Sequence, residues 1–250
     1  PLVERPMLDN LNAMRGKRAL ITGASAGIGR ACAISLAQCG MHLVLTGRKV
    51  VELEAVAQEC RDKGVNVVAL AGDLNNKPFV RQLAQTAHDA DVFVNNAGIL
   101  YYAPILDMPV EECEQMFATN VIACYDISRE VAQHMVARGG GQMIFVTSGS
   151  ARNVGMHAVV YAATKHAVSA FAKGFRLELK SANVRVTELA PGMVDTDMRK
   201  GITHPDVLKA LAARPYQPIS AQDVADGVVY AVSCQATNSP DLIELRPPRA

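Results

Sequence analysis

The sequence of 250 residues lacks the features of several protein classes. Its 25 Lys and Arg nearly balance its 24 Asp and Glu, so the net charge of +1 favours neither a nucleic acid nor an anionic membrane surface as a partner. No apolar run approaches the roughly 18 residues that a membrane-spanning helix needs. Residues 1–17 contain no apolar core of the kind found in a secretory signal peptide. We therefore expect no association with nucleic acid or membrane.

Cysteine is present, but not in a metal-binding or redox pattern. The six cysteines form no C-x-x-C pair and no cluster with histidine. Most of them stand beside Ala, Ile or Val in helical patterns, so we expect buried, reduced thiols, no metal site and a cytoplasmic location. The cysteines are Cys32, Cys39, Cys60, Cys113, Cys124 and Cys234.

Short apolar runs alternate with helical segments along the chain. The chain is 50% hydrophobic and long enough for one α/β domain with a large core, and we expect an N-terminal arm over residues 1–16 followed by a single domain over 17–250. The alternation predicts a doubly wound, Rossmann-type parallel sheet of about seven strands in the order 3-2-1-4-5-6-7, with helices on both faces. The expected strands are 18–22, 43–46, 66–70, 91–94, 143–146, 184–189 and 242–245, and the expected helices are 30–38, 51–63, 77–86, 109–137, 158–175 and 221–233.

A glycine-rich turn, GASAGIG, separates the first expected strand from the first helix. Its glycines are Gly23, Gly27 and Gly29. Without a Cβ the backbone can turn tightly and approach a pyrophosphate, which then lies at the N-terminus of the helix. Such a turn is a weak signal alone, but its place between an apolar run and a helix indicates a dinucleotide site.

The end of the second expected strand carries no acidic residue that could grip the 2′-hydroxyl of NAD. Gly47 leaves space there, and Arg48 offers a planar fork that suits a 2′-phosphate, whereas the nearest acid is Glu52. We therefore predict NADP(H) as the cofactor. The alternative is that Arg48 and Lys49 only solvate a loop.

The third and sixth expected strands also end in residues that suit a ligand. Asp73, followed by Leu74, could accept a hydrogen bond from an adenine amino group, or it could cap the next helix. Pro191 and Gly192 break the sixth strand where a nicotinamide would lie. Ligands in such folds bind outside the carboxyl ends of the strands, so these positions predict one shared site.

The fourth expected strand runs into Asn95-Asn96-Ala97-Gly98. The two side-chain amides can tie neighbouring strand ends together. The small residues Ala97 and Gly98 would let the backbone pass close to a ribose.

The stretch from residue 143 to residue 165 contains the strongest candidates for chemistry. Tyr161 and Lys165 are four residues apart, so on a helix they share one face. An ammonium close to a phenol lowers the phenol pKa from about 10, which favours a role as general acid or base. Ser148, at the end of the preceding strand, could donate to the same reacting oxygen. By itself, the Tyr-x-x-x-Lys spacing also fits a half-exposed pair with no function.

Asn120 stands inside the long expected helix between 109 and 137. Its amide competes with the backbone, so it is a poor residue for a helix interior. One interpretation is a kink that frees a carbonyl group for function, and the other is an ordinary surface residue.

Residues 193–218 are rich in Met, Arg, Lys and Pro and show little regular pattern, which is typical of a mobile lid. The cations of this segment hint at an acidic substrate, although a solvated lid face explains them as well. We expect the substrate pocket to be lined by Tyr101, Tyr102, Ser150, Asn153, Met156, Met193, Met198 and His204.

In combination, these motifs resemble the short-chain dehydrogenase/reductase family, in its subtype of about 250 residues. The resemblance covers the whole chain after the arm. It rests on the order of Thr22-Gly23-x-x-x-Gly27-Ile28-Gly29, Asn95-Asn96-Ala97-Gly98, Asn120, Ser148, Tyr161-x-x-x-Lys165 and Pro191-Gly192.

The resemblance implies a role for each of these residues. Tyr161 would be the catalytic acid/base in hydride transfer between NADP(H) and a carbonyl or alcohol substrate. Lys165 would lower its pKa and bind the nicotinamide ribose. Ser148 would hold the substrate oxygen, and Asn120 would anchor a water leading from Lys165 to solvent.

The resemblance also implies the cofactor contacts. Asp73 would lie at the adenine, Asn95 at the ribose and Thr196 at the nicotinamide carboxamide. The full expected set is Gly23, Ser25, Gly27, Ile28, Gly29, Arg48, Asp73, Leu74, Asn95, Ala97, Gly98, Tyr161, Lys165, Pro191, Gly192, Val194 and Thr196.

Further details resemble a bacterial NADP-dependent subgroup that includes 3-hydroxy acid and serine dehydrogenases and clavulanate-type aldehyde reductases. They are the segments 201–204 and 221–225 and the ending Ile243-x-Leu245-Arg246-Pro247. Substrates vary widely within that subgroup. Two alternatives remain: an NAD-dependent alcohol dehydrogenase of the same family, and a non-catalytic NADP-binding sensor module.

The segment 158–175 is apolar almost all round. A helix that lies on a sheet with one side in water should show a polar stripe, so this one needs a second cover. A partner copy of the same helix is the simplest cover. We therefore expect a homo-oligomer, more readily a tetramer than a dimer.

Overall fold

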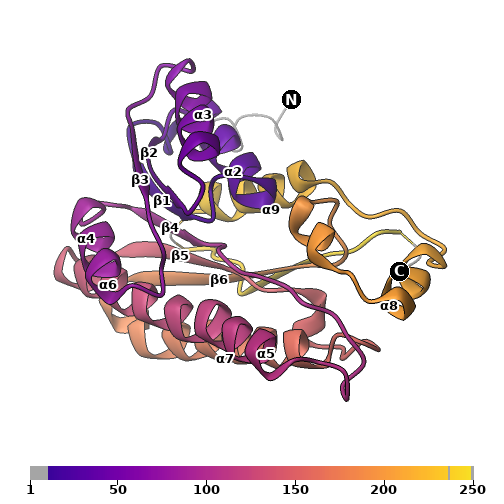
Figure 1. Ribbon diagram of the computed structural model, residues 1–250. Helices are drawn as coiled ribbons and strands as arrows, with labels where there is room; N and C mark the ends of the chain where they lie inside the picture. The colour runs from indigo at the N-terminus through magenta and orange to yellow at the C-terminus, as the bar shows by residue number, and fades with distance from the viewer. Residues whose placement is uncertain (1–10, 236, 249–250) are drawn as a thin grey trace.

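The computed structural model describes residues 11–235 and 237–248, and within them it contains a seven-stranded parallel sheet (Figure 1). The strand order is β3-β2-β1-β4-β5-β6-β7, with every neighbouring pair parallel. The predicted fold class and strand order are therefore confirmed. The strands are β1 (Arg18–Thr22), β2 (His42–Gly47), β3 (Val67–Ala71), β4 (Val92–Asn95), β5 (Gly141–Val146), β6 (Val184–Pro191) and β7 (Leu242–Leu245).

Helices cover both faces of this sheet, as Figure 1 shows. One face carries α2 (Gly27–Gln38), α3 (Val50–Arg61) and α9 (Ala221–Ser233), and the other carries α4 (Lys77–Thr86), α6 (Cys124–Ala137) and α7 (Val159–Leu179). The remaining helical segments are α5 (Val110–Phe117), η1 (Ala118–Ala123), η2 (Gly149–Ala151), η3 (Lys180–Ala182), η4 (Asp197–Gly201) and α8 (Pro205–Ala212).

Alternate residues of the strands point into two separate cores. In β1, Ile21 packs with α2, α3 and α9, whereas its neighbour Leu20 packs with the helices of the opposite face. The strands are therefore apolar on both sides, which is what a parallel sheet covered twice requires. None of the helices in the described residues is long and apolar enough to cross a membrane.

The expected N-terminal arm is only partly described. Residues 1–10 lie outside the described part of the chain, but Met14 is buried in the core beside α2. The end of the expected arm thus packs as part of the domain.

The expected lid contains more regular structure than the sequence pattern predicted. Residues 197–201 form the 3-10 turn η4 and residues 205–212 form helix α8, with Pro205 in its first turn. The expectation of little regular pattern is therefore wrong. The reason is that α8 has only eight residues and lies in a segment with Pro205, Pro215 and Pro218, so it is too short to stand out in the sequence.

Candidate active site

The glycine-rich turn has the geometry of a cradle for an anionic group. Gly23 adopts a positive φ of 66°, and a Cβ at Gly29 would collide with the carbonyl oxygen of Gly23. Helix α2 begins at Gly27 behind Ala26, which provides no side-chain cap, so its first N–H groups can bind an anionic group. Ile28 is half-buried and packs against the hydrophobic core. The turn therefore fits the pyrophosphate of a dinucleotide.

The base of the lid lies directly against this turn. A Cβ at Gly27 would lie 3.2 Å from Cγ2 of Thr196. The two ends of the lid are joined, because Val194 pairs with Ile219 and the Ile219 N–H donates to the carbonyl of Met193 at 2.9 Å. The structure thus brings Thr196 and Val194 beside the glycine-rich turn.

Gly47, at the end of β2, lies close to the same turn. A Cβ at Gly47 would lie 3.0 Å from Oγ of Ser25, so a larger residue would crowd this corner. Arg48 is exposed and forms no ion pair within the described residues, whereas Lys49 lies 3.7 Å from Glu52. The guanidinium of Arg48 is therefore available to a ligand.

Asp73 does not cap helix α4, so that alternative is wrong. The cap is Asn76, whose side chain accepts from the N–H of Phe79. Asp73 is exposed beyond β3 and accepts from the N–H of Asn75 at 2.9 Å, while Leu74 is nearly buried. The adenine contact of Asp73 stays a prediction.

The side chain of Asn95 is buried, and its Oδ1 accepts from the hydroxyl of Thr22 at the end of β1 at 3.5 Å. It is 4% exposed, and its Nδ2 donates to the carbonyl of Cys124 at 3.1 Å and to Oγ of Ser128 at 2.9 Å. The side chain of Asn95 is thus engaged within the protein, and the contact of Asn95 with the ribose stays a prediction.

Asn96 ties two strand ends together. Its Nδ2 donates to the carbonyl of Thr22 at 3.0 Å. The hydroxyl of Thr22 in turn accepts from the N–H groups of Asn96 and Ala97, both at 3.0 Å. The prediction that these amides join neighbouring strand ends is confirmed for Asn96.

Strand β6 extends through Pro191 and the chain turns at Gly192, whose N–H donates to the carbonyl of Leu245 at 2.7 Å. A Cβ at Gly149, the residue after Ser148, would lie 3.7 Å from Cα of Gly192. The ends of β5 and β6 therefore meet next to Ser148.

Ser148, Tyr161 and Lys165 converge at this edge of the sheet. Ser148 caps the short turn η2, and its Oγ accepts from the N–H of Ser150 at 3.1 Å. Tyr161 and Lys165 lie on the inner face of α7 and are 7% and 6% exposed. The ammonium of Lys165 lies 5.7 Å from the ring centroid of Tyr161 and donates to the carbonyl of Val146 at 3.2 Å. The alternative of a half-exposed pair is therefore wrong.

Burial changes the pKa values of Tyr161 and Lys165 in opposite directions. It raises the pKa of Tyr161 to about 12, and a hydrogen bond with Ser148 opposes this rise. Burial also lowers the pKa of Lys165 to about 8. Burial sets the direction of the pKa of Tyr161 in this arrangement, and the lowering of that pKa by Lys165 stays a prediction.

Asn120 lies in η1, a π-helical segment between α5 and α6, and is 1% exposed. Its Oδ1 accepts from the N–H of Ile99 at 2.8 Å, and its Nδ2 donates to the carbonyl of Ile99 at 2.9 Å and to Thr164 at 3.2 Å. The alternative of a surface residue is therefore wrong, and the distorted helix is observed. A Cβ at Gly98 would lie 3.2 Å from Oδ1 of Asn120 and 3.7 Å from Nζ of Lys165, which places both groups around Gly98.

Side chains from the lid and from residues 100–102 pack around Tyr161. The ring of Tyr102 meets the ring of Tyr161 edge-on at 5.8 Å between centroids. Ile202 and Val207 of the lid join the same apolar cluster as Tyr161, together with Leu100. This cluster shields Tyr161 from water on the lid side.

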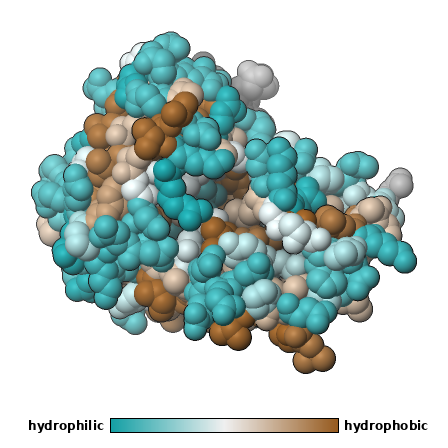
Figure 2. All heavy atoms as spheres, in the orientation of Figure 1, coloured by the Kyte–Doolittle hydropathy of each residue, from teal (hydrophilic) through white to brown (hydrophobic). Residues whose placement is uncertain are grey.

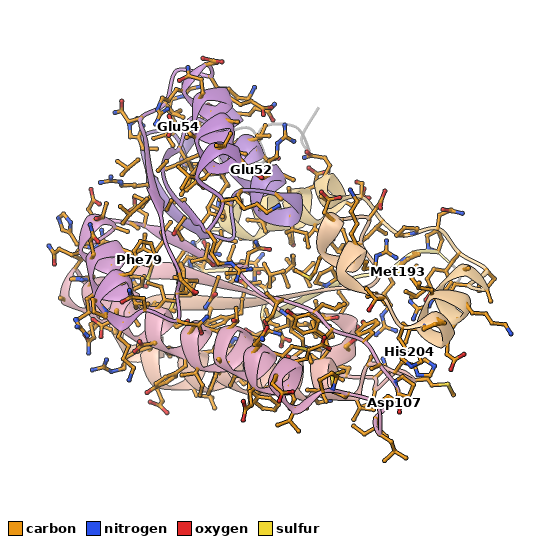
Figure 3. The ribbon with its side chains drawn as sticks, viewed as in Figure 1. Glu52, Glu54, Phe79, Asp107, Met193 and His204 are labelled. Atoms are coloured by element: carbon orange, nitrogen blue, oxygen red, sulfur yellow. The ribbon has the colours of Figure 1, made fainter. Side chains whose placement is uncertain are left out.

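The other expected pocket residues divide into two groups. Met193 lies at the base of the lid (Figure 3), where its sulfur accepts from Arg214 at 3.1 Å. Ser150 is partly buried in η2. Met156 is 82% exposed, and Asn153 and Met198 are also exposed. A role of these three exposed residues in the substrate pocket stays a prediction.

His204 connects the lid to the loop that precedes α5. It caps α8 and lies 3.6 Å from Asp107 through Nε2, and the two side chains point toward one another in Figure 3. Tyr101 faces α5, where its hydroxyl donates to Gln115 at 3.0 Å. The ring of Tyr101 is half-buried and packs against the same apolar cluster as Tyr161.

A family model described as short chain dehydrogenase matches residues 17–206. The chain belongs to this family. The resemblance drawn from the motifs is thus confirmed at the level of the family, which is one of oxidoreductases.

Several known members of the family are similar over nearly the whole chain. Dehydrogenase/reductase SDR family member 11 of Gallus gallus is 34% identical over 93% of this chain and 96% of its own length. The structure of a 7 alpha-hydroxysteroid dehydrogenase complexed with NADH and 7-oxo glycochenodeoxycholic acid is 29% identical, with a TM-score of 0.84 over 95% of each chain. That of L-sorbose reductase from Gluconobacter frateurii, complexed with NADPH and L-sorbose, is 29% identical with a TM-score of 0.81 over 93% of this chain and 95% of its own.

One group at the site was not anticipated from the sequence. Glu188 lies in β6 with 2% exposure and receives hydrogen bonds from the two segments that flank Ser148. The available signal in the sequence was an acidic residue inside a strand, next to the apolar Leu189 and Ala190.

Proposed function

We propose that the protein is an NADP(H)-dependent oxidoreductase that transfers a hydride between the nicotinamide and a carbonyl or alcohol substrate. One observation carries this proposal. Ser148, Tyr161 and Lys165 converge at the carboxyl edge of a parallel sheet, where ligands of such folds bind.

A bound nicotinamide cofactor would supply or accept the hydride. Tyr161 gives its proton to the substrate oxygen in reduction, and Ser148 donates a hydrogen bond to the same oxygen. Burial raises the pKa of Tyr161 to about 12, so its hydroxyl is protonated at neutral pH and carries the proton that reduction consumes. Lys165 would hold the nicotinamide ribose, and Asn120 would anchor the water that leads from Lys165 to solvent.

The glycine-rich turn would hold the pyrophosphate, and Thr196 would hold the carboxamide. Similar structures contain either NADH or NADPH, so they do not choose between the two cofactors. The choice of NADP(H) rests on Arg48, which is exposed at the end of β2 and free to bind a 2′-phosphate.

The replacement Arg48→Gln tests this choice. A charge-assisted hydrogen bond contributes about 1.5–3 kcal/mol, so the KM for NADPH should rise about 10-fold or more while the KM for NADH stays the same. Lys49→Gln is the matched control, since Lys49 already lies beside Glu52. A wild-type preference for NADH would defeat the argument from Arg48 and favour an NAD-dependent alcohol dehydrogenase.

The substrate is a small molecule that would lie between Ser148, Tyr161 and the lid. Tyr102 and Met193 are the best placed of the expected pocket residues, and the lid would cover the substrate. The similarity to 3-hydroxy acid and serine dehydrogenases and to clavulanate-type aldehyde reductases stays a hypothesis about the subgroup.

A panel of aldehydes, ketones and hydroxy acids, each tested with NADPH and NADH, separates an enzyme from a non-catalytic sensor. An enzyme should oxidise NADPH with at least one carbonyl compound. A protein that binds NADPH tightly and turns over none of the panel would fit the sensor. The presence of Ser148, half-buried, beside the buried Tyr161 and Lys165 favours the enzyme.

We also propose a homo-oligomer, more readily a tetramer than a dimer. A groove of about 570 Å³ runs between α6 and α7. Its lining includes the aromatic or apolar side chains of Tyr125, Val136, Ala170 and Phe171. A second copy of the same two helices would cover this groove. All six cysteines are free, which agrees with a reducing compartment such as the cytoplasm.

A further inference from the structure

Strand β6 carries a buried carboxylate that three surrounding segments bind. Glu188 accepts from the hydroxyl of Thr147 at 2.7 Å and from the hydroxyl of Ser169 at 3.0 Å. It also pairs with the guanidinium of Arg152 through two contacts of 2.9 Å and 2.8 Å. Arg152 continues to Glu244 of β7 at 3.0 Å. Both oxygens of the carboxylate are therefore used.

The three partners stand next to the catalytic candidates in the sequence. Thr147 directly precedes Ser148, and Arg152 directly follows η2, which Ser148 caps. Ser169 lies on α7 one turn after Lys165. One carboxylate thus binds both sides of the serine turn and the helix that carries Tyr161.

The opposite charges of Glu188 and Arg152 stabilise the geometry of this network. Burial disfavours the charged form of Glu188, but hydrogen bonds from Arg152 and Thr147 outweigh it and hold the pKa of Glu188 below its usual value. A carboxylate that stays ionised keeps its acceptor geometry at every working pH. Hydrogen bonds to a charged acceptor are shorter and stronger than neutral ones, so this group resists displacement.

We propose that Glu188 is a positioning residue, which fixes the hydroxyl of Ser148 relative to Tyr161 by binding Thr147, Arg152 and α7 at once. The inference rests on the proposed function, since it concerns how the reacting groups are held. Catalytic groups need to be held within about 0.5 Å, and a misplacement of about 1 Å can cost about 10²-fold in rate.

Two substitutions weaken this arrangement by different amounts. Thr147→Val keeps the side-chain shape and removes one hydrogen bond, so the fold should survive. Glu188→Gln removes the charge and leaves Arg152 to Glu244. Each should lower kcat with NADPH about 10-fold or more, with Glu188→Gln the larger loss. The dissociation constant of NADPH should stay within about 2-fold, because the cofactor groove is untouched.

A double-mutant cycle with Ser148→Ala separates positioning from plain stabilisation. If Glu188 acts through Ser148, Thr147→Val should cause no further loss of kcat in the Ser148→Ala background. If the losses multiply instead, the proposal is overturned. Should Ser148→Ala itself keep full activity, the proposed role of Ser148 has failed, and the exchange measurement below still decides about Glu188.

Hydrogen exchange measured by mass spectrometry reports on the turn without any need for activity. The amides of residues 148–152 should exchange faster in Thr147→Val and Glu188→Gln than in the wild type. Unchanged exchange in both variants would refute the proposal.

Arg176→Met is the matched control for both readouts. Arg176 joins the same helix to the same strand away from Ser148, since its Nε donates to the carbonyl of Val186 at 2.9 Å and it pairs with Asp241. This variant should lose stability yet keep kcat and the exchange rate of residues 148–152. An equal loss of kcat in Arg176→Met would contradict a specific role for Glu188.

Discussion

At the scale of single residues, the sequence located the reacting groups but not their acidity. The spacing of Tyr161 and Lys165 correctly placed both on one face of a helix. Their pKa values depend on burial, which the spacing does not reveal, and burial makes the phenol weaker as an acid and the ammonium stronger. Asn95 shows the same limit, because only the fold shows that its side chain points into the core.

The buried ammonium of Lys165 leads to a prediction about stability. Its pKa is about 8 in the folded protein and 10.5 in the unfolded chain, so between these values the unfolded chain binds more protons. Stability from this group therefore rises with pH through that window. The free energy of unfolding of the wild type, taken relative to that of Lys165→Met, should rise by on the order of 2 kcal/mol between pH 8 and pH 10. Urea unfolding of both proteins at the two pH values measures this gain.

Lys173→Met provides the control for that comparison. Lys173 is exposed on the same helix, so its replacement should leave the difference from the wild type independent of pH in this window. A pH-independent difference for Lys165→Met as well would show that Lys165 is not a destabilised cation.

At the scale of elements, regular patterns were predictable and local distortions were not. The seven strands agree with the expected ones to within about two residues, since apolar runs bounded by glycine and polar residues define them. The expected helix over 109–137 is interrupted by η1, because the side chain of Asn120 bonds to Ile99 far along the chain. Helix α8 was missed because it has only eight residues, with a proline at its start and another soon after its end.

The strand–turn–helix element at the start of the domain gives a second prediction. Gly29→Ala would force a Cβ against the carbonyl of Gly23 and open the turn. The dissociation constant of NADPH, measured by fluorescence, should rise at least about 10-fold, as expected when a preorganised turn is disturbed. The control is Gly174→Ala, a helical glycine whose Cβ would meet nothing within 4 Å. Equal cofactor affinity in Gly29→Ala and the control would contradict the proposed cradle.

At the scale of the whole molecule, the strand order followed from the alternation of strands and helices, because connections between parallel strands are short and right-handed. The site residues at strand ends, such as Gly23, Asp73 and Ser148, then follow from one rule, that ligands bind at the carboxyl edge. The network around Glu188 could not be foreseen, since Glu188 is between 19 and 41 residues away from Thr147, Arg152 and Ser169 in the sequence. Apolar side chains also remain at the surface, and Figure 2 shows brown patches along the lower edge, where Figure 1 places α5 and α7.

The exposed groove between α6 and α7 predicts how assembly can be broken. Ala170→Glu places a charge in this groove, so the mass measured by light scattering should fall below that of the wild type. Ala55→Glu is the matched control, an exposed alanine of α3 on the other face of the sheet, and should leave the mass unchanged. A wild type that is already monomeric, or an unchanged mass in Ala170→Glu, would refute this interface.

The most direct test of the account compares Tyr161→Phe with the wild type in the reduction of a carbonyl substrate by NADPH. Loss of the phenol should lower kcat/KM by at least the 10²–10⁴-fold typical of general acid catalysis, while NADPH binding stays within about 2-fold. The control Tyr230→Phe, on α9 and half exposed, should keep full activity. Near-normal turnover by Tyr161→Phe would contradict the central claim that Tyr161 supplies the proton.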